Sequence, residues 1–303
     1  MGGPAPEQIE YVDRATGERR REIVYGETEL RLLYYRPLGR LLRRLMVRRP
    51  WFSRCNGWFK RRPGSRARIV DFATRYQVNV EEAEKPLHQY ASLDEFFCRR
   101  LTPGARPICR EAEALLSPAD GRALACALSA DTHFSIKGQK VAVAELLGDG
   151  TAARALAGGW ALVVRLAPKD YHRFHFPVDG HADAARFIGG LLESVHPLAL
   201  AAGARSFANQ RCVTRLESRW GPVFMVEVGA LTVGTIEQTY TPGPVMRGAE
   251  KGFFRFGGST VVLLWGPQGP VIDADIRANS AVGLETLVNY GTRIASALNK
   301  DFP

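Results

Sequence analysis

The chain has 303 residues, a formal net charge of +10 and an apolar fraction of 46%. These values fit a globular protein with one large domain or two modest ones, and they exclude a fibrous or low-complexity chain. The five cysteines are an odd number without a CxxC pair, which argues against a zinc ribbon or a disulfide framework and favours a reducing compartment. The first ten residues lack the order of a signal peptide, and no run approaches the ~18 apolar residues of a membrane span, so we expect a cytosolic chain.

The N-terminal third is predicted to hold an arm and a helical region. Residues 1–30 are polar and predict a loosely held arm, and residues 31–105 read as mostly helical. Residues 31–68 contain thirteen Lys or Arg and no Asp or Glu. Leucines at helical spacing stand opposite these arginines, at positions Leu38, Leu41, Leu42 and Leu45, and Trp and Phe residues follow. This pattern predicts a basic amphipathic helix that binds an anionic membrane surface.

Two other interpretations of this basic region stay open. A solvated helix face can dock on the protein's own core, which is the common fate of a charged amphipathic helix. A nucleic-acid site is the third interpretation, but the leucine content suits lipid better than phosphate alone.

Elements further along the chain predict the fold class. The sequence Ser92-Leu93-Asp94-Glu95 predicts a helix capping box, and residues 102–107 form a breaker-rich linker. Short apolar runs bounded by Gly and Pro then predict strands at 161–166, 223–228 and 261–265, with helices expected at 191–200 and 284–298. We therefore expect an α+β fold: a helical, membrane-facing N-terminal segment and a mainly antiparallel β domain over residues 106–303.

Two stretches carry residues suited to chemistry. "SPADG" at 117–121, which contains Asp120, makes a good turn by itself. "KDYHRFHFP" at 169–177 holds His172 and His175 among aromatic residues. These histidines can be structural, can form a weak HxxH metal site without an obvious third ligand, or can serve as a general base and a separate proton donor.

A third stretch, "FGGST" at 256–260, precedes an apolar run that predicts a core strand. It is either a turn or a bond meant to break. Gly258 leaves its carbonyl unshielded, and the Ser259 hydroxyl can attack that carbonyl, shifting the acyl group from nitrogen to oxygen. Such an attack needs a base, and a base works best when a carboxylate orients it. Ser259, His175 and Asp120 would supply these three roles.

Taken together, these stretches resemble one family, the pyruvoyl-dependent phosphatidylserine decarboxylases. The resemblance covers roughly residues 25–300. Its motifs are "SLDEFFCRRLTPGARPI", "SPADG", "FSIKG", "DYHRFHFPVDG", "VGALTVGTI", "KGFFRFGGST" and "NSAVGLETLVNYG". Gly257 departs from the pattern, since many members carry a larger apolar residue there, but the Gly-Ser pair is intact. His196 stands where Asn is common and is given no role.

The resemblance implies a mechanism and site residues. Asp120, His175 and Ser259 match the family's self-cleavage triad, and His172 matches the position linked to proton handling in decarboxylation. Cleavage of the Gly258–Ser259 bond would give a β chain, 1–258, and an α chain, 259–303. Ser259 would become a covalent pyruvoyl (pyruvate) cofactor, which forms a Schiff base with the substrate amine and acts as an electron sink as carbon dioxide leaves. No metal is implied.

The resemblance also implies partners and a location. The substrate is phosphatidylserine in anionic membranes, the cleaved chains stay together as a heterodimer that can dimerise again, and no nucleic acid is involved. We expect the enzyme at the cytoplasmic face of the cell membrane, as a peripheral protein. Two rival hypotheses are a soluble serine hydrolase and a non-cleaving membrane-binding relative. Both would leave one intact chain.

Overall fold

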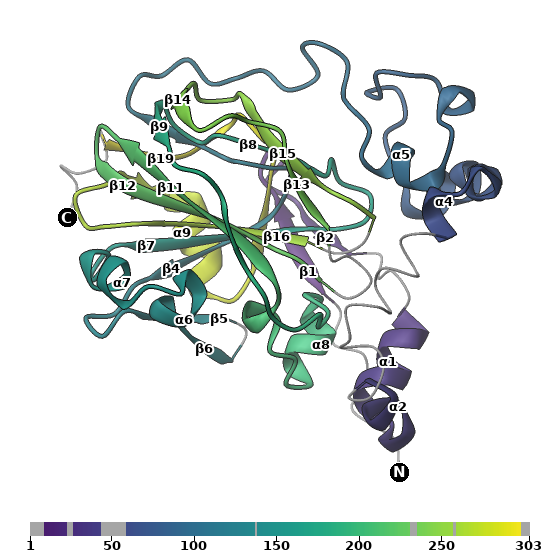
Figure 1. Ribbon diagram of the computed structural model, residues 1–303, viewed down its shortest axis with the longest axis horizontal. Coiled ribbons are helices and arrows are strands. Elements are labelled where there is room, and N and C mark those ends of the chain that lie inside the picture. The colour runs from purple at the N-terminus through teal and green to yellow at the C-terminus, as the bar shows by residue number, and fades with distance from the viewer. Residues whose placement is uncertain are drawn as a thin grey trace.

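The computed structural model describes residues 9–22, 27–43, 59–136, 138–230, 235–256 and 259–297. Figure 1 shows a β-rich body, from which α1 and α2 project on one side while α4 and α5 form a separate lobe. Gly258 and the basic stretch 44–58, with Leu45, lie outside the described residues. In the described part of the chain no helix is long and apolar enough to span a bilayer.

The helical elements are short. Their bounds are α1 Glu27–Tyr35, α2 Pro37–Leu42, η2 Pro63–Arg68, α4 Ile69–Tyr76, η3 Leu87–Gln89, α5 Leu93–Phe97, α6 Val143–Leu147, α7 Gly150–Ala155, α8 Pro197–Ala201, η4 Ser206–Ala208 and α9 Ala274–Ala281.

The strands account for most of the body. Their bounds are β1 Glu10–Asp13, β2 Arg19–Arg21, β3 Ala114–Leu116, β4 Gly121–Ala127, β5 His133–Ile136, β6 Gln139–Ala142, β7 Trp160–Leu166, β8 Arg173–His175, β9 Gly180–Ala182, β10 Arg186–Ile188, β11 Arg211–Ser218, β12 Gly221–Val228, β13 Ile236–Gln238, β14 Gly243–Val245, β15 Glu250–Phe254, β16 Ser259–Trp265, β17 Val271–Ile272, β18 Glu285–Val288 and β19 Arg293–Ser296.

A large sheet organises the molecule. Within the described residues its order is β14-β9-β11-β12-β16-β7-β4-β18-β1-β2, with β10 paired to β11. A three-stranded sheet, β13-β15-β8, packs against it. The described ladders are antiparallel except for β1 with β18. The predicted α+β class with a mainly antiparallel β domain is therefore confirmed, as are the three predicted strands, which correspond to β7, β12 and β16.

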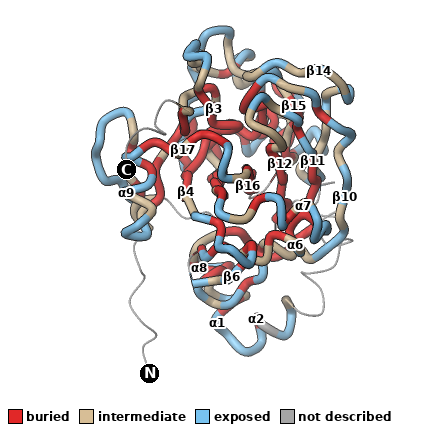
Figure 2. Tube along the Cα trace, turned by 90° about the vertical axis from the view of Figure 1, so that its left-hand side faces the viewer, coloured by how far each residue is buried: buried red, intermediate tan, exposed pale blue. Residues whose placement is uncertain are grey.

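The core lies on both faces of the large sheet, as the buried central strands in Figure 2 show. One face contributes to an inner cluster, shared with the three-stranded sheet, that includes Leu162, Val164, Phe174, Phe254, Val261 and Leu263. The other face contributes to an outer cluster, covered by α6, α7 and the β5–β6 hairpin, that includes Leu146, Val163, Val226, Val262 and Leu264. Alternation along a strand therefore decides which cluster each side chain of β16 enters.

Two expectations about local structure were wrong, and a third was only partly right. The N-terminal arm is not loosely held where it is described: β1 pairs with β18, and Tyr11 is buried. The helix expected at 284–298 is instead β18 and β19, because a turn that includes Gly291, at a φ of 79°, reverses the chain. The helix expected at 191–200 is reduced to α8, which starts at Pro197.

The capping box at Ser92 is confirmed in its first half. The Glu95 amide donates to Ser92 Oγ at 3.1 Å, while Glu95 Oε2 accepts from the Ala91 amide at 2.7 Å. The cap starts α5, which buries Phe96 and Phe97 in an aromatic cluster. The predicted domain boundaries at residues 30 and 105 stay predictions.

Candidate active site

Ser259 is the first residue of β16, a strand paired on both sides. It lies opposite Leu166 of β7, and β12 flanks β16 on the other edge. The apolar run that follows it, Val261 to Trp265, is buried on both faces, which fixes the strand in the centre of the sheet. Ser259 is also fully buried, and its Oγ has no hydrogen-bond partner among the described residues. A buried hydroxyl left unpaired costs about 1–3 kcal/mol and is rare enough to suggest a functional reason.

The Ser259 side chain points into the inner cluster. Ser259 shares a face of β16 with Val261 and Leu263, which belong to that cluster, whereas Thr260 shares the opposite face with Val262. The strands β8 and β15 cover the inner face, and β15 leads along the chain toward residue 259. The serine therefore faces the sheet that carries His175.

His175, at the end of β8, is held as a neutral ring. Its Nδ1 lies 3.0 Å from the Gly248 carbonyl oxygen, which can only accept, so Nδ1 carries the proton. Burial lowers the pKa of His175 to about 4. The ring stacks on Tyr290 with centroids 3.9 Å apart and an interplanar angle of 7°. Nε2 is buried with no partner in the described part of the chain, so a bare basic nitrogen is available.

Asp120 follows Ser117-Pro118-Ala119 and directly precedes β4. The Arg106 guanidinium donates to both of its carboxylate oxygens, at 2.8 to 3.2 Å, and the Tyr290 amide donates to Oδ1 at 2.8 Å. Burial raises the pKa of Asp120, although Arg106 and the Tyr290 amide oppose this shift. Tyr290 thus connects the two predicted residues, through its amide to Asp120 and through its ring to His175.

The structure brings Asp120 and His175 into one cluster but does not join the predicted triad by hydrogen bonds. The Arg106 guanidinium binds the Asp120 carboxylate, and the Gly248 carbonyl accepts from His175 Nδ1. The expected hydrogen bond between Asp120 and His175 is therefore not among those that the described residues form. Continuing the β4–β7 register by one pair sets Gly121 opposite Leu166, which pairs with Ser259. Asp120, which directly precedes Gly121, therefore lies about two strand spacings, roughly 10 Å, from the row of the sheet that contains Ser259. Their roles stay predictions.

The close approach of β7 explains why a glycine, Gly121, follows Asp120. A Cβ there would lie 2.6 Å from the Arg165 carbonyl oxygen and 2.8 Å from Val164 Cγ1, closer than real Cβ atoms approach. The missing side chain lets β4 pack against β7 at this point. The glycine that completes the "SPADG" turn therefore also allows the strand packing that positions the Asp120 carboxylate.

His172 lies in the loop between β7 and β8, beside the segment that leads to the predicted cleavage position. Its Nδ1 donates to the Asp170 carbonyl at 2.9 Å, and Asp170 is paired with Arg122 in the interior. The ring is fully buried, 3.8 Å from the ring of Phe97. Phe97 also contacts Phe256, with centroids 4.6 Å apart. His172 is therefore positioned near the chain three residues before Ser259.

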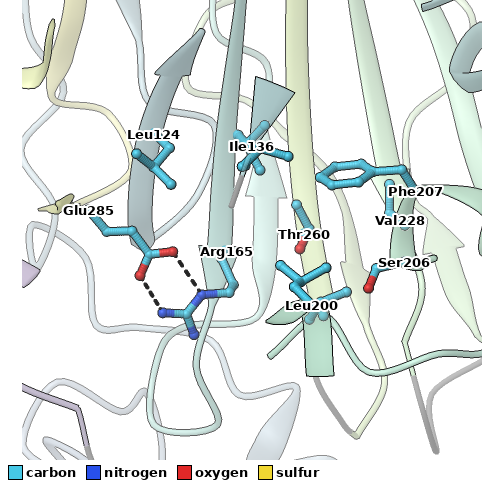
Figure 3. A pocket seen from close by; sticks show the side chains of 11 residues that line it. Leu124, Ile136, Arg165, Leu200, Ser206, Phe207, Val228, Thr260 and Glu285 are labelled. Carbon is cyan, nitrogen blue, oxygen red and sulfur yellow. Dashed lines mark hydrogen bonds and ion pairs between the residues drawn. The ribbon is translucent and has the colours of Figure 1, made fainter. Parts of the chain in front are cut away.

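A narrow pocket lies on the reverse side of β16, as Figure 3 shows. Its lining is mainly apolar, with Leu124, Ile136, Leu200, Phe207 and Val228 among the labelled side chains. At one end Arg165 and Glu285 face each other in an ion pair of 2.6 Å. Thr260 lines the pocket directly after Ser259, so an apolar space with one charged end adjoins the predicted reaction position.

Sequence reasoning missed several buried polar groups around the site. Arg106 and Tyr290 complete the Asp120 cluster, and Glu227 of β12 forms an ion pair of 3.0 Å with Lys251 of β15 in which both side chains have no exposed surface. The available signal was a single Glu inside the apolar run "VFMVEV" and a Lys directly before "GFF". A charged side chain inside a core strand is costly to bury, so it needs a partner of opposite charge.

The fold is α+β, and its core strand β16 begins with a buried serine that has no hydrogen-bond partner among the described residues. The sheet facing this strand carries a neutral histidine, His175. Residues 93–296 match the family described as phosphatidylserine decarboxylase. Similar curated relatives are each named phosphatidylserine decarboxylase proenzyme. That of Chlamydia trachomatis serovar L2 is 44% identical over 95% of this chain and 97% of its own length. That of Chlamydia muridarum is 44% identical over 93% and 95%. That of Chlamydia pneumoniae is 41% identical over 96% and 98%. The chain belongs to the phosphatidylserine decarboxylase family.

Proposed function

We propose that this chain converts phosphatidylserine to phosphatidylethanolamine and carbon dioxide after cleaving itself between Gly258 and Ser259. The observation that carries the proposal is the buried Ser259 hydroxyl at the first position of a core strand, which forms no hydrogen bond with any residue that the structure describes. It occurs in a chain that belongs to the family and whose relatives are named proenzymes. No observation favours the rival serine hydrolase, and the relatives that match nearly the whole chain are named as decarboxylase proenzymes.

Self-cleavage requires two proton abstractions in this proposal. In the first step Ser259 Oγ attacks the Gly258 carbonyl carbon, loses its proton to a base, and forms an ester as the amide C–N bond breaks. In the second step the Cα proton of residue 259 is removed and the Gly258 carboxylate leaves. We assign His175 and Asp120 to this reaction. The neutral ring and bare Nε2 of His175 support a role as a base, and Tyr290 couples that ring to Asp120.

The residues present fit a pyruvoyl group at position 259. The precursor of that group is serine, and the hydroxyl of Ser259 is committed to no other contact in the described part of the chain. The group supplies a ketone carbonyl that binds the substrate amine and accepts electrons as carbon dioxide leaves. His172, held by the Asp170 carbonyl beside the chain that leads to Ser259, is assigned the return of a proton to the substrate carbon.

The exposed apolar side chains of α1 and α2 support a membrane role. On α2, Leu38 is 66% exposed and Leu41 is 50% exposed. Tyr34 of α1, by contrast, is buried in a cluster with Ala199 and Ala204. Figure 2 shows these helices as an exposed projection. We propose that this leucine face and the basic residues around it hold the enzyme at the cytoplasmic face of the cell membrane.

The decisive experiment is an intact-mass measurement on the purified protein. The proposal expects two fragments, 1–258 and 259–303, with residue 259 present as pyruvoyl, and release of phosphatidylethanolamine from phosphatidylserine vesicles. The Ser259→Ala variant provides the control, because it removes both the attacking hydroxyl and the pyruvoyl precursor. A single uncleaved wild-type chain, or two fragments from Ser259→Ala, would contradict the proposed cleavage site.

A further inference from the structure

Asp94 of α5 binds the segment that leads to the predicted cleavage position. β15 ends at Phe254, and its pairing with β13 ends there too. Beyond the strand, the Phe256 amide donates to Asp94 Oδ1 at 3.1 Å, and the Arg255 guanidinium donates to Asp94 Oδ2 at 2.8 Å. The guanidinium also donates to Glu237 Oε1 of β13 at 3.0 Å. Asp94 is only 3% exposed, and hydrogen bonds that involve charged groups are the stronger ones in proteins, so each carboxylate oxygen fixes one of two consecutive residues.

The Phe256 side chain is held by the same lobe, that of α4 and α5 (Figure 1). The centroid of its ring lies 4.6 Å from that of Phe97 on α5 and 5.6 Å from that of Phe72 on α4. Lys60 Nζ lies 3.6 Å from the centroid of the Phe256 ring, which is a cation–π contact. The lobe therefore holds both the backbone and the ring of Phe256.

The helix that carries Asp94 is capped by other residues. An aspartate in the first turn of a helix usually serves the helix itself, by accepting from its free amides. In α5 that work is done by Ser92 Oγ, which accepts from the Glu95 amide, and by Glu95 Oε2, which accepts from the Ala91 amide. Both oxygens of Asp94 bind residues 255–256 instead. Helix capping therefore does not explain this carboxylate, and its contacts point to the segment that it holds.

Phe256 and Ser259 are fixed points on either side of the proposed reaction position. Ser259 pairs with Leu166 in the large sheet, and Phe256 is bound by Asp94. Only two residues separate these points in the sequence, and one residue spans at most ~3.6 Å. The position of Phe256 therefore limits where the Gly258 carbonyl can lie relative to the Ser259 hydroxyl. Reacting atoms must come within about 3–3.5 Å in the right orientation, and a misplacement of about 1 Å can cost about 10²-fold in rate.

We infer that Asp94 is a positioning residue of self-cleavage. Through its hydrogen bond to the Phe256 amide, it keeps the Gly258 carbonyl within reach of the Ser259 hydroxyl in the first step. The role is geometric, and the proton is still taken by the base assigned above, His175. The inference rests on the proposed function, because it concerns the same self-cleavage.

The test compares the cleavage rates of freshly synthesised wild type, Asp94→Ala, Asp94→Asn and Ser92→Ala on denaturing gels. Asp94→Ala removes the acceptor and should cleave at least about tenfold more slowly. Asp94→Asn keeps an oxygen that can accept from the Phe256 amide, so it should recover most of the lost rate. Ser92→Ala is the matched control, since it removes the cap of the same helix but neither bond to residues 255–256. It should cleave at the wild-type rate.

A merely structural role of Asp94 predicts a different pattern. If the carboxylate only stabilises the lobe, Asp94→Ala and Ser92→Ala should slow cleavage in proportion to their losses in melting temperature, which are measured in the Ser259→Ala background. That result, equal slowing in Asp94→Asn and Asp94→Ala, or wild-type cleavage in Asp94→Ala would overturn the inference while leaving the proposed function in place. An uncleaved wild type would instead overturn the proposed function, and this inference with it. If Asp94→Ala does not fold, Asp94→Leu, which fills the space of the carboxylate without an acceptor, decides by the same criteria.

Discussion

Arg165 and Glu285 form a buried, bidentate ion pair, with Nε–Oε1 at 3.2 Å and Nη2–Oε2 at 2.6 Å, that joins β7 to the C-terminal strand β18. In the proposed mature enzyme these residues belong to different chains. The same is true of Arg14 and Asp273, 2.7 Å apart, and of β16 with its neighbours β7 and β12. A break at residue 258 would therefore leave two chains that share one sheet and one core.

The first prediction concerns this pair. Glu285→Gln should lower the free energy of unfolding by about 1–3 kcal/mol, because Arg165 loses one buried carboxylate but keeps Glu22. In a cleaved preparation the small fragment should dissociate at a lower urea concentration. Glu217→Gln is the control, since the Arg215–Glu217 pair is exposed and should contribute less than about 1 kcal/mol. Equal urea midpoints for the two variants would contradict the role of Glu285 in holding the chains together.

The second prediction concerns processing. Asp120→Asn and His175→Ala should each slow self-cleavage by at least about 10²-fold, because the first weakens the Arg106–Asp120–Tyr290 arrangement and the second removes the basic nitrogen. The uncleaved fraction is followed on denaturing gels after synthesis. Val282→Ala, at a residue that is 70% exposed, serves as the control. Wild-type processing in both site variants would remove them from the reaction.

Much of this site could be predicted from the sequence because its residues occur in continuous motifs. The apolar run after Ser259 identified β16, and "HRFH" identified His175 of the facing sheet and His172 in the loop before it. Glu227 and Lys251 could not be paired in this way, because 24 positions separate them in the sequence and only the packing of two sheets brings them together. The hydrogen bonds from the Arg106 guanidinium to Asp120 could not be predicted for the same reason.

The errors in the fold have a related cause. Residues 284–298 are apolar enough for a helix, yet pairing with β4, β1 and β3 makes strands of β18 and β19. Composition predicted a loose N-terminal arm, but β1 adds to the edge of β18, and Arg14 binds Asp273. In both places tertiary pairing outweighed local preference, which a single sequence does not reveal.

The third prediction is a pH dependence of stability. The pKa of His175 is lowered to about 4 by burial, below its ordinary 6.5, so protonation favours the unfolded chain. Its contribution is fully present above pH 6.5 and is lost as the pH falls toward 4, by about 2–3 kcal/mol between pH 7 and pH 4.5. Urea unfolding of Ser259→Ala, which stays uncleaved, should show this loss. Ser259→Ala/His175→Phe should show a smaller decrease, and an equal decrease would exclude His175 as the cause.

The fourth prediction concerns the membrane surface. Leu38→Glu/Leu41→Glu should weaken sedimentation with anionic vesicles by at least about tenfold, because two exposed apolar side chains can no longer enter the bilayer interface. Val282→Glu, at an exposed apolar residue on the body, is the matched control and should bind as the wild type does. Wild-type binding should weaken with salt without disappearing. Equal binding of wild type to neutral and anionic vesicles would refute the electrostatic part.

The last prediction separates cleavage from turnover at His172. This ring lies between Phe97 and the Asp170 carbonyl, beside the chain that leads to Ser259, and is assigned the return of a proton to the substrate carbon. His172→Ala should therefore yield two fragments with an intact pyruvoyl group, yet form phosphatidylethanolamine at least about 10²-fold more slowly per cleaved molecule. If the ring only supports the packing of Phe97, processing should slow as well or the melting temperature should fall. The cleaved fraction, the melting temperature and the product formed per cleaved enzyme are measured on the same preparation, with His172→Gln as the variant that keeps a polar side chain. Full activity per cleaved molecule in His172→Ala would remove this histidine from the mechanism.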